Sequence, residues 1–198
     1  MRATLSDNAG SQAAQAALDE AAQIALARRD PRAFAPLYER YADPIYRYCH
    51  RRLGDPDAAA DATSKVFVRA LAALPRYRHD SFRSWLFAIA HNTLVDGWRT
   101  ARIVAPLDAG AEHADPAPSP EDQLLSADAG REIRALLARL PADQRHVVEM
   151  RLAGLSNQEI AAALGRSVGA TKMLHVRALT TLRALLQPET PGGSGEEP

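Results

Sequence analysis

The stretch from Gly154 to Arg183 reads as two helices joined by a short turn, and it constrains the fold more than any other part of the chain. Ser156 and Glu159 have the S-x-x-E spacing of a capping box, in which each side chain satisfies a backbone donor at the first helical turn. Gly165 stands where a left-handed residue closes a helix without steric cost. Ser167 can then cap a second, longer helix. The pattern predicts a helix-turn-helix.

The second of these helices has two different sides. Residues at i, i+3 and i+7 form a core-facing stripe, namely Val168, Thr171, His175, Ala178, Leu182 and Leu185. His175 is expected to be a half-buried core residue. Opposite the stripe lie Gly169, Met173, Val176, Arg177 and Thr180, with Ala170 and Lys172 on its flanks. In a helix-turn-helix this outward side enters the major groove of DNA, whereas the alternative is a packed hairpin with no DNA role.

The net charge of zero is a sum over blocks of opposite sign. Residues 31–102 and 131–187 each carry +5, whereas residues 103–130 carry −6 with no Lys or Arg. Two basic blocks suit a polyanionic partner, because each neutralised phosphate releases counterions. The acidic block between them needs a separate explanation.

The rest of the composition excludes several classes. Among 198 residues there is one cysteine, Cys49, so no internal disulfide can form, and no spacing of metal ligands appears. There are no paired carboxylates, nucleophile motif or phosphate-cradling glycine loop, so we expect no enzyme, cofactor, metal or small-molecule substrate. No run of 18 apolar residues and no signal peptide is found, which favours a cytoplasmic protein.

Helical periodicity predicts an all-α fold of two small domains joined by a linker. We expect an N-terminal extension at 1–30 with an Ala-rich helix, a first domain at 31–102, an acidic and proline-containing linker at 103–130, a second domain at 131–187 and a disordered tail at 188–198.

Aromatic and basic residues gather in the loop after Pro75 and in the helix that follows. Five of the eleven aromatic residues, Tyr77, Phe82, Trp85, Phe87 and Trp98, lie within 22 positions. They are interleaved with Arg76, Arg78, Arg83 and Arg99, as single-stranded nucleic acid requires for stacking and for tracking the backbone. One stripe of the helix, with Phe82 and Leu86, is a core face. For the second stripe, Phe87, His91, Leu94 and Trp98, packing on a neighbouring helix is the alternative.

Three motifs carry a family resemblance. They are D-A-T-S-K-V-F-V-R-A at 61–70, S-F-R-S-W-L-F-A-I-A-H-N-T-L-V-D at 81–96, and L-P-A-D-Q-R-H-V-V at 140–148 running into the helix-turn-helix. On these residues the chain, from about Phe34 to Leu186, resembles an extracytoplasmic-function (ECF) sigma factor of the sigma-70 family. Such a factor binds core RNA polymerase and directs promoter recognition, melting and transcription initiation.

The resemblance implies three sites. The first binds core RNA polymerase and maps to Asp61, Ser64, Lys65, Phe67 and Val68. The second melts and reads the promoter -10 element and maps to Arg76, Tyr77, Arg78, Phe82, Arg83, Trp85, Asn92, Asp96 and Arg99. The third reads the -35 element and maps to Arg166, Ser167, Gly169, Ala170, Lys172, Met173 and Arg177. An anti-sigma protein is a further expected partner, and the acidic linker is expected to follow a path built for nucleic acid.

The sequence departs from the family pattern at three places: Ser64-Lys65 replaces the usual Gln-Glu, His91 a frequent Arg, and Met173-Leu174-His175 a common Ser-Arg-Leu. The promoter sequence therefore cannot be carried over. The rival interpretation is a two-component-type regulator with a similar helix-turn-helix, whose N-terminal half would alternate strands and helices. This chain offers helical patterns only.

Overall fold

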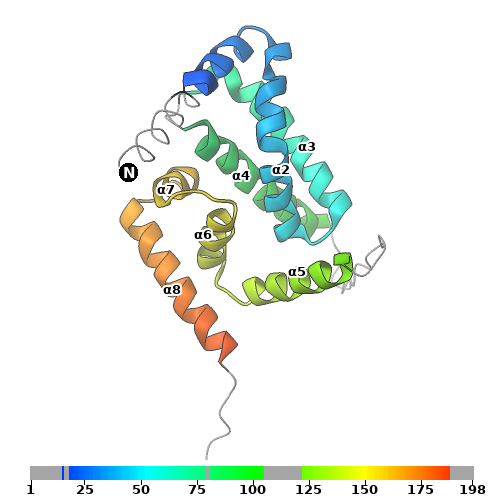
Figure 1. Ribbon diagram of the computed structural model, residues 1–198, viewed down its shortest axis with the longest axis vertical. Coiled ribbons are helices and arrows are strands. Elements are labelled where there is room, and N and C mark those ends of the chain that lie inside the picture. Colours follow the sequence, from blue (N-terminus) through cyan, green and yellow to red (C-terminus); the bar gives the residue numbers. More distant parts are fainter. Residues whose placement is uncertain (1–14, 16–17, 79–80, 105–121, 188–198) are drawn as a thin grey trace, which may run out of the picture. The chain divides into compact units, whose positions relative to one another are not determined.

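The computed structural model describes residue 15 and residues 18–78, 81–104 and 122–187 (Figure 1). The chain divides into two compact units, Met1–Ala114 and Asp115–Pro198, which are described separately below. Every element in the described ranges is an α-helix or a short 3-10 helix. The segments predicted as a disordered N-terminus, as most of the linker and as the tail lie outside these ranges. Among the described residues, no helix has the length and apolar character needed to cross a membrane.

The first unit is built from helices whose ends follow from the sequence. Residues 18–27 are helical, followed by η1 (Pro31–Phe34), α2 (Ala35–Leu53), α3 (Pro56–Ala73), η2 (Leu74–Arg76) and α4 (Phe82–Val104). Asp55 caps α3 by accepting a hydrogen bond from the Ala58 amide at 2.6 Å. Gly54 ends α2 with φ of 76°, a left-handed conformation that favours glycine.

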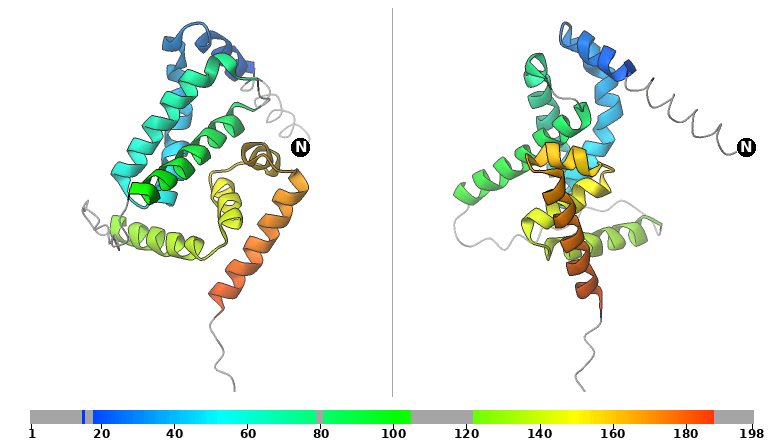
Figure 2. Two further views of the ribbon diagram at one scale, coloured as in Figure 1. Left: turned by 180° about the vertical axis from the view of Figure 1, so that it is seen from behind. Right: turned by 90° about the vertical axis from the view of Figure 1, so that its left-hand side faces the viewer.

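The core of this unit lies between α2, α3 and α4, which run side by side in all views (Figures 1 and 2). Because α4 contacts both α2 and α3, it is apolar on two sides. Phe87 and Leu94 of its second stripe are buried, and the Phe87 ring lies 5.4 Å from the ring of Tyr48. Packing on a neighbouring helix is therefore the correct alternative for these two residues. The side chains of residues 98–104, including Trp98 and Arg99, are outside the described part.

The helix at residues 18–27 packs on the first unit instead of standing apart from it. Ile24 and Ala27 are buried, and the Tyr41 hydroxyl donates a 2.6 Å hydrogen bond to Glu20, which also pairs with Arg40 at 3.3 Å. Burial, and then the bond to Glu20, raise the pKa of Tyr41 far above its ordinary value. A raised pKa means that the neutral hydroxyl stabilises the fold below about pH 10, and that this contribution is lost only in stronger alkali.

Cys49 lies fully buried on α2 as a core thiol. Burial raises the pKa of this thiol to about 11, against a smaller opposing effect of a hydrogen bond with Thr63. The thiolate, which is the reactive form, is therefore scarce at neutral pH.

The second unit contains α5 (Asp122–Ala138), α6 (Ala142–Leu152), α7 (Asn157–Leu164) and α8 (Val168–Leu186). Its core includes Leu137, Leu140, Val148 and Ala178, with Leu182 packed against them. At the end of α6, Met150 is buried and Leu152 is exposed.

Helices extend into both ends of the segment 103–130 that the sequence assigns to the linker. Residues 103–104 complete α4, and residues 122–130 form the first half of α5. The prolines end at Pro120, and the following residues Gln123, Leu124 and Leu125 favour a helix. A net negative charge does not prevent helix formation. The charge of residues 103–130 therefore does not show where the first half of α5 begins.

We expect Tyr41→Phe to lower the free energy of unfolding by about 1.5 kcal/mol, because Glu20 loses a hydrogen-bond donor while the ring remains in place. Urea titration followed by circular dichroism measures the change. Tyr46→Phe, which alters a half-buried tyrosine on the same helix, is the matched control. Equal effects of the two substitutions would contradict the assigned role of the Tyr41 hydroxyl.

Candidate nucleic-acid interface

The turn between α7 and α8 has the geometry that the sequence predicts. The Ser156 amide donates to the Glu159 carboxylate at 2.8 Å, and the Glu159 amide donates to the Ser156 hydroxyl at 3.2 Å, which completes the capping box. Gly165 has φ of 63°. The Ser167 hydroxyl accepts from the Ala170 amide at 3.1 Å, and α8 begins at the next residue, Val168. These bonds confirm the helix-turn-helix and fix the direction of α8.

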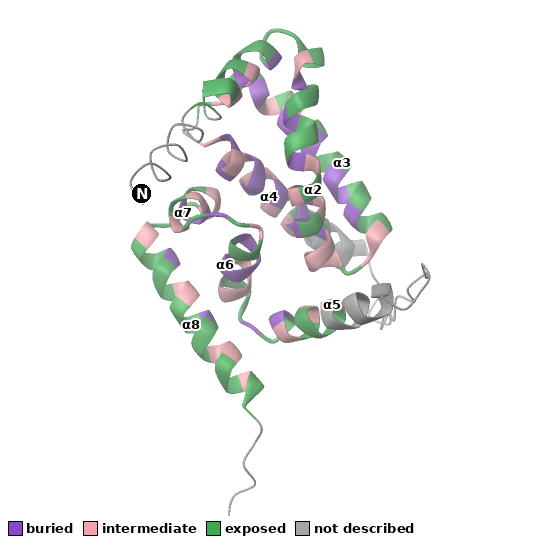
Figure 3. Ribbon diagram, in the orientation of Figure 1, coloured by how far each residue is buried: buried purple, intermediate pink, exposed green. Residues whose placement is uncertain are grey.

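The two sides of α8 are also as predicted. Thr171 and Ala178 are buried, and His175 is half-buried, whereas much of the rest of the helix is exposed (Figure 3). All seven residues predicted to face the -35 element are exposed: Arg166, Ser167, Gly169, Ala170, Lys172, Met173 and Arg177. They form one continuous outward surface on the turn and the first half of α8, which we name the α8 surface.

The α8 surface is positively charged, and its cationic side chains differ in their contacts. Arg166 forms an ion pair with Asp143 of α6 at 2.8 Å, so its guanidinium helps to fix the turn on the neighbouring helix. Lys172 and Arg177 are exposed beside the centre of the surface. Since α8 contains no Asp or Glu, nothing on this helix opposes the approach of a phosphate backbone.

Gly169 has no structural reason within the chain to lack a side chain. A Cβ atom built at this position meets no atom within 4 Å, and the residue lies in the regular helix α8. Glycine at such a position costs stability relative to alanine. The absence of a side chain is useful where another molecule approaches the helix backbone closely.

In the first unit, the predicted melting surface is centred on Tyr77. Its ring packs on Trp85 at 5.0 Å and on Phe82 at 5.7 Å, both in edge-to-face geometry. Arg76 and Arg78 beside it are exposed, whereas Tyr77, Arg83 and Trp85 are half-buried. Phe82 is only 1% exposed, so the prediction that it contacts DNA is corrected: it supports Tyr77 and Trp85 from within the core.

Two further residues of this surface lie on α4. Asn92 is exposed, and Asp96 is exposed but held by Arg69 of α3 at 2.9 Å. Arg69 also donates to the Thr93 hydroxyl at 3.1 Å. Asp96 therefore joins α4 to α3, a role that its spacing in the sequence does not reveal.

The outward side of α3 carries the residues expected to bind polymerase. Asp61, Ser64, Lys65 and Val68 are exposed, and Lys65 pairs with Asp61 at 3.5 Å. Val68 is 69% exposed, a large value for an apolar side chain on a helix with a well-formed core side. We name these four residues the α3 surface.

Phe67, the fifth residue of that prediction, is buried and is corrected to a core residue. Its ring instead supports Tyr38 of α2, whose ring lies 4.7 Å away and is 47% exposed. The sequence did not single out Tyr38, which follows the fully buried Leu37 on α2. Its exposure makes it a further candidate contact beside the α3 surface.

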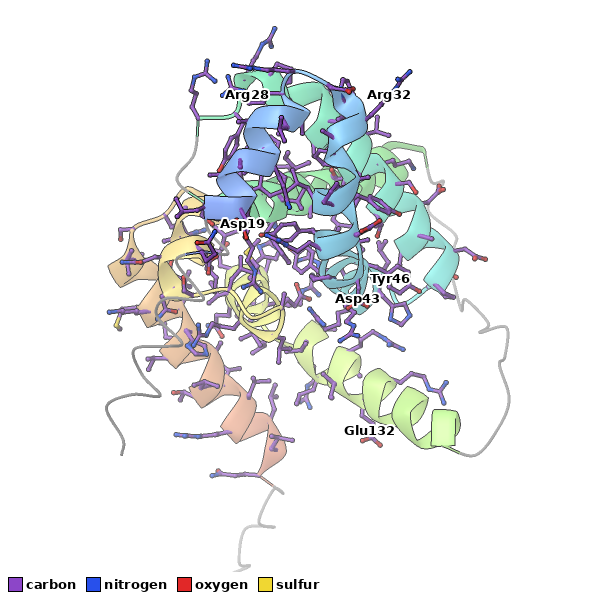
Figure 4. All side chains as sticks on the ribbon, turned by 45° about the horizontal axis from the view of Figure 1, so that its top comes forward. Asp19, Arg28, Arg32, Asp43, Tyr46 and Glu132 are labelled. Carbon is purple, nitrogen blue, oxygen red and sulfur yellow. The ribbon has the colours of Figure 1, made fainter. Side chains whose placement is uncertain are left out.

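Sequence reasoning also missed Arg28. Its guanidinium donates to the carbonyl oxygen of Pro75 at 3.2 Å. The bond connects the end of the N-terminal helix to residues 75–78, which we name the Tyr77 loop. Arg28 and Arg32 lie at the same end of the first unit, where that helix turns into η1 (Figure 4). No local pattern predicts a contact between positions 47 residues apart.

Comparison with known proteins gives the same two-part division. Sigma-70 region 2 matches residues 37–103, and sigma-70 region 4 matches residues 130–182. The ECF RNA polymerase sigma factor BldN of Streptomyces coelicolor is 35% identical over 159 residues, which cover 78% of this chain and 60% of BldN. The ECF RNA polymerase sigma factor ShbA of Streptomyces griseus is 37% identical over 155 residues, which cover 71% of this chain and 81% of ShbA.

Among solved structures, CnrH in complex with the cytosolic domain of CnrY is similar to this chain. The TM-score is 0.64 with 28% identity, and the match covers 83% of this chain and 94% of the matched chain. The first unit matches sigma-70 region 2, and it is wholly helical over its described residues. Both findings exclude a two-component-type regulator, whose N-terminal half would alternate strands and helices.

We expect Gly169→Ala to raise the free energy of unfolding by roughly 0.5–1 kcal/mol and yet to weaken the binding of duplex DNA. The added methyl group stabilises the helix but stands on the side that DNA approaches. Thermal melting and fluorescence anisotropy at low salt measure the two effects. Gly130→Ala in α5, where a Cβ atom meets only Arg134 at an ordinary 3.6 Å, should stabilise without changing DNA affinity. Unchanged or tighter binding by Gly169→Ala would refute the close approach.

Proposed function

We propose, because the chain belongs to the ECF sigma factors of the sigma-70 family, that it binds core RNA polymerase and directs promoter recognition, melting and transcription initiation. The observation that carries this proposal is that each of two separate units matches one sigma region and presents the surface that its region would need. The polymerase would supply the chemistry, so no catalytic step is ascribed to this chain.

The α3 surface is the proposed contact with core polymerase. Its centre is the exposed Val68, with Tyr38 as an additional aromatic contact supported by Phe67. Aromatic and apolar side chains that become fully desolvated contribute most of the affinity at protein interfaces. The polar residues Asp61, Ser64 and Lys65 would then form the rim.

The Tyr77 loop and the start of α4 are the proposed site for the melted -10 element. Tyr77 and Trp85 offer half-buried rings on which an unstacked base can pack, at about 1–3 kcal/mol per base, while Arg76 and Arg78 can contact the backbone. The packing of both rings on Phe82 holds them in place before DNA arrives. Pre-organisation of this kind reduces the entropy cost of binding.

The α8 surface is the proposed reader of the -35 element. Its helix is fixed by two capping serines and by the pair between Arg166 and Asp143. Lys172 and Arg177 are placed to contact phosphates, while the centre of the surface faces the base edges.

An inhibitory protein partner is also proposed. The similar CnrH is seen in complex with the cytosolic domain of a second protein, CnrY. A partner of this chain that covered the α3 surface or the α8 surface would prevent initiation, since both surfaces are needed at once.

Transcription in vitro from a library of random promoters, with purified core polymerase, tests the proposed function. We expect the chain to select templates with two conserved elements separated by a fixed spacing. No transcription above core polymerase alone would refute the proposal.

We expect Val68→Asp to weaken the affinity for core polymerase at least about tenfold, because a charge replaces an apolar side chain at a desolvated contact. Titration of the fluorescently labelled chain with core polymerase measures the affinity. Val176→Asp, which alters a similarly exposed valine on α8, should leave it unchanged. If both variants bind core polymerase as the parent does, the α3 surface is not the contact.

We expect Tyr77→Ala and Asn92→Ala to reduce transcription from a closed duplex promoter. A template with a pre-melted bubble over the -10 region separates the causes: it rescues a variant that is defective only in melting and does not rescue one that is defective in reading bases. Tyr46→Ala, at another half-buried tyrosine of this unit, is the control and should transcribe normally. Normal activity of both test variants on the closed duplex would disprove the assignment.

A further inference from the structure

Three neighbouring side chains on the outward side of α8 are apolar. Met173 is 53% exposed and Val176 is 57% exposed. Ala170 lies three residues before Met173, and Val176 lies three residues after it, so the three side chains follow one another along the same side of the helix. A thioether and methyl groups therefore form an apolar strip on this side of the helix.

Charged groups lie close to this apolar strip. Arg177 is exposed one turn after Met173 on the same side of α8, Lys172 is exposed at the edge of that side, and Arg166 is already paired with Asp143 at 2.8 Å. The nearby cations and the absence of any carboxylate on α8 favour a polyanion as the occupant.

Only one base presents an apolar group in the major groove. Thymine carries a 5-methyl group there, whereas the other base edges offer mainly hydrogen-bond donors and acceptors. A donor or acceptor buried against Met173 would lose its water and gain no partner, which is costly. Burial of a thymine methyl group in the same place would be favourable in free energy, and the flexible thioether can adapt to the position of the methyl group.

We propose that Met173 is a specificity-determining residue that selects thymine in the -35 element by contact with its 5-methyl group. The proposal rests on the proposed function, because it requires that α8 enters the major groove of promoter DNA. It differs from recognition by arginine, which selects guanine through two hydrogen bonds.

Deoxyuridine provides the test, because it differs from thymidine only in lacking the 5-methyl group. The reconstituted holoenzyme is first used to select a promoter, and each thymine of the selected -35 element is then replaced singly by deoxyuridine. At one thymine or more we expect the affinity of the parent holoenzyme to fall about fourfold. This fall corresponds to about 0.8 kcal/mol, the free energy gained by burying one methyl group.

Two variants assign the effect to Met173. Met173→Gln has a similar length but a polar end, and should lose the distinction between thymidine and deoxyuridine at that position, whereas Met173→Leu should keep it. Leu186→Gln, which alters a more exposed apolar residue in the last turn of the same helix, should retain the full methyl dependence. Thermal melting of the variants shows whether each is folded.

The outcomes separate the two proposals. A selected promoter whose thymines can all be replaced by deoxyuridine without loss would overturn the role of Met173 and leave the proposed function standing. That role would also be overturned if Met173→Gln keeps the methyl dependence, or if the apolar strip proves to bind a protein and not DNA. Failure to select any promoter would overturn both.

Discussion

Phe82, the first residue of α4, packs against four other aromatic rings, and the first unit depends on that packing. The ring centroids lie at 6.5 Å from Phe34, 5.5 Å from Tyr41, 5.7 Å from Tyr77 and 5.3 Å from Trp85. Each such pair contributes about 0.5–1.5 kcal/mol beyond the burial of its area. Tyr41 also holds the N-terminal helix through its hydrogen bond to Glu20. The Phe82 ring on α4 therefore connects α4 to α2, to the Tyr77 loop and, through Tyr41, to the N-terminal helix.

This packing explains why exposed aromatic residues and a stable core occur together in so small a unit. Tyr77 and Trp85 each pack against Phe82 and are only half-buried, so in the proposed function part of each ring is open to a base without rearrangement. Phe67 supports Tyr38, beside the α3 surface, in the same way. In the second unit, hydrogen bonds at the helix ends hold α8 in place and leave its outward side exposed.

The parts of this structure that could be predicted from the sequence are those fixed by neighbours in the chain. Ser156, Glu159, Gly165 and Ser167 satisfy groups within a few residues of themselves, so both helices of the helix-turn-helix begin where their caps indicate. The contacts of Tyr41 with Glu20, Arg28 with Pro75 and Arg69 with Asp96 join positions 21, 47 and 27 residues apart, and no periodicity encodes them. The family resemblance assigned Phe67 and Phe82 to binding sites, whereas helical periodicity had already placed Phe82 on a core face, and both side chains are buried.

Neither unit alone is expected to recognise a promoter. Each basic block carries a net charge of only +5, and two small modules on a linker lose entropy when they bind together unless core polymerase fixes their spacing. The direct measurement compares the selected promoter with a scrambled duplex, at physiological salt, for the chain alone and for the holoenzyme. We expect weak and nearly equal binding of the two duplexes by the chain alone, and strong preference for the promoter by the holoenzyme. Tight, sequence-specific binding by the chain alone would contradict this dependence on core polymerase.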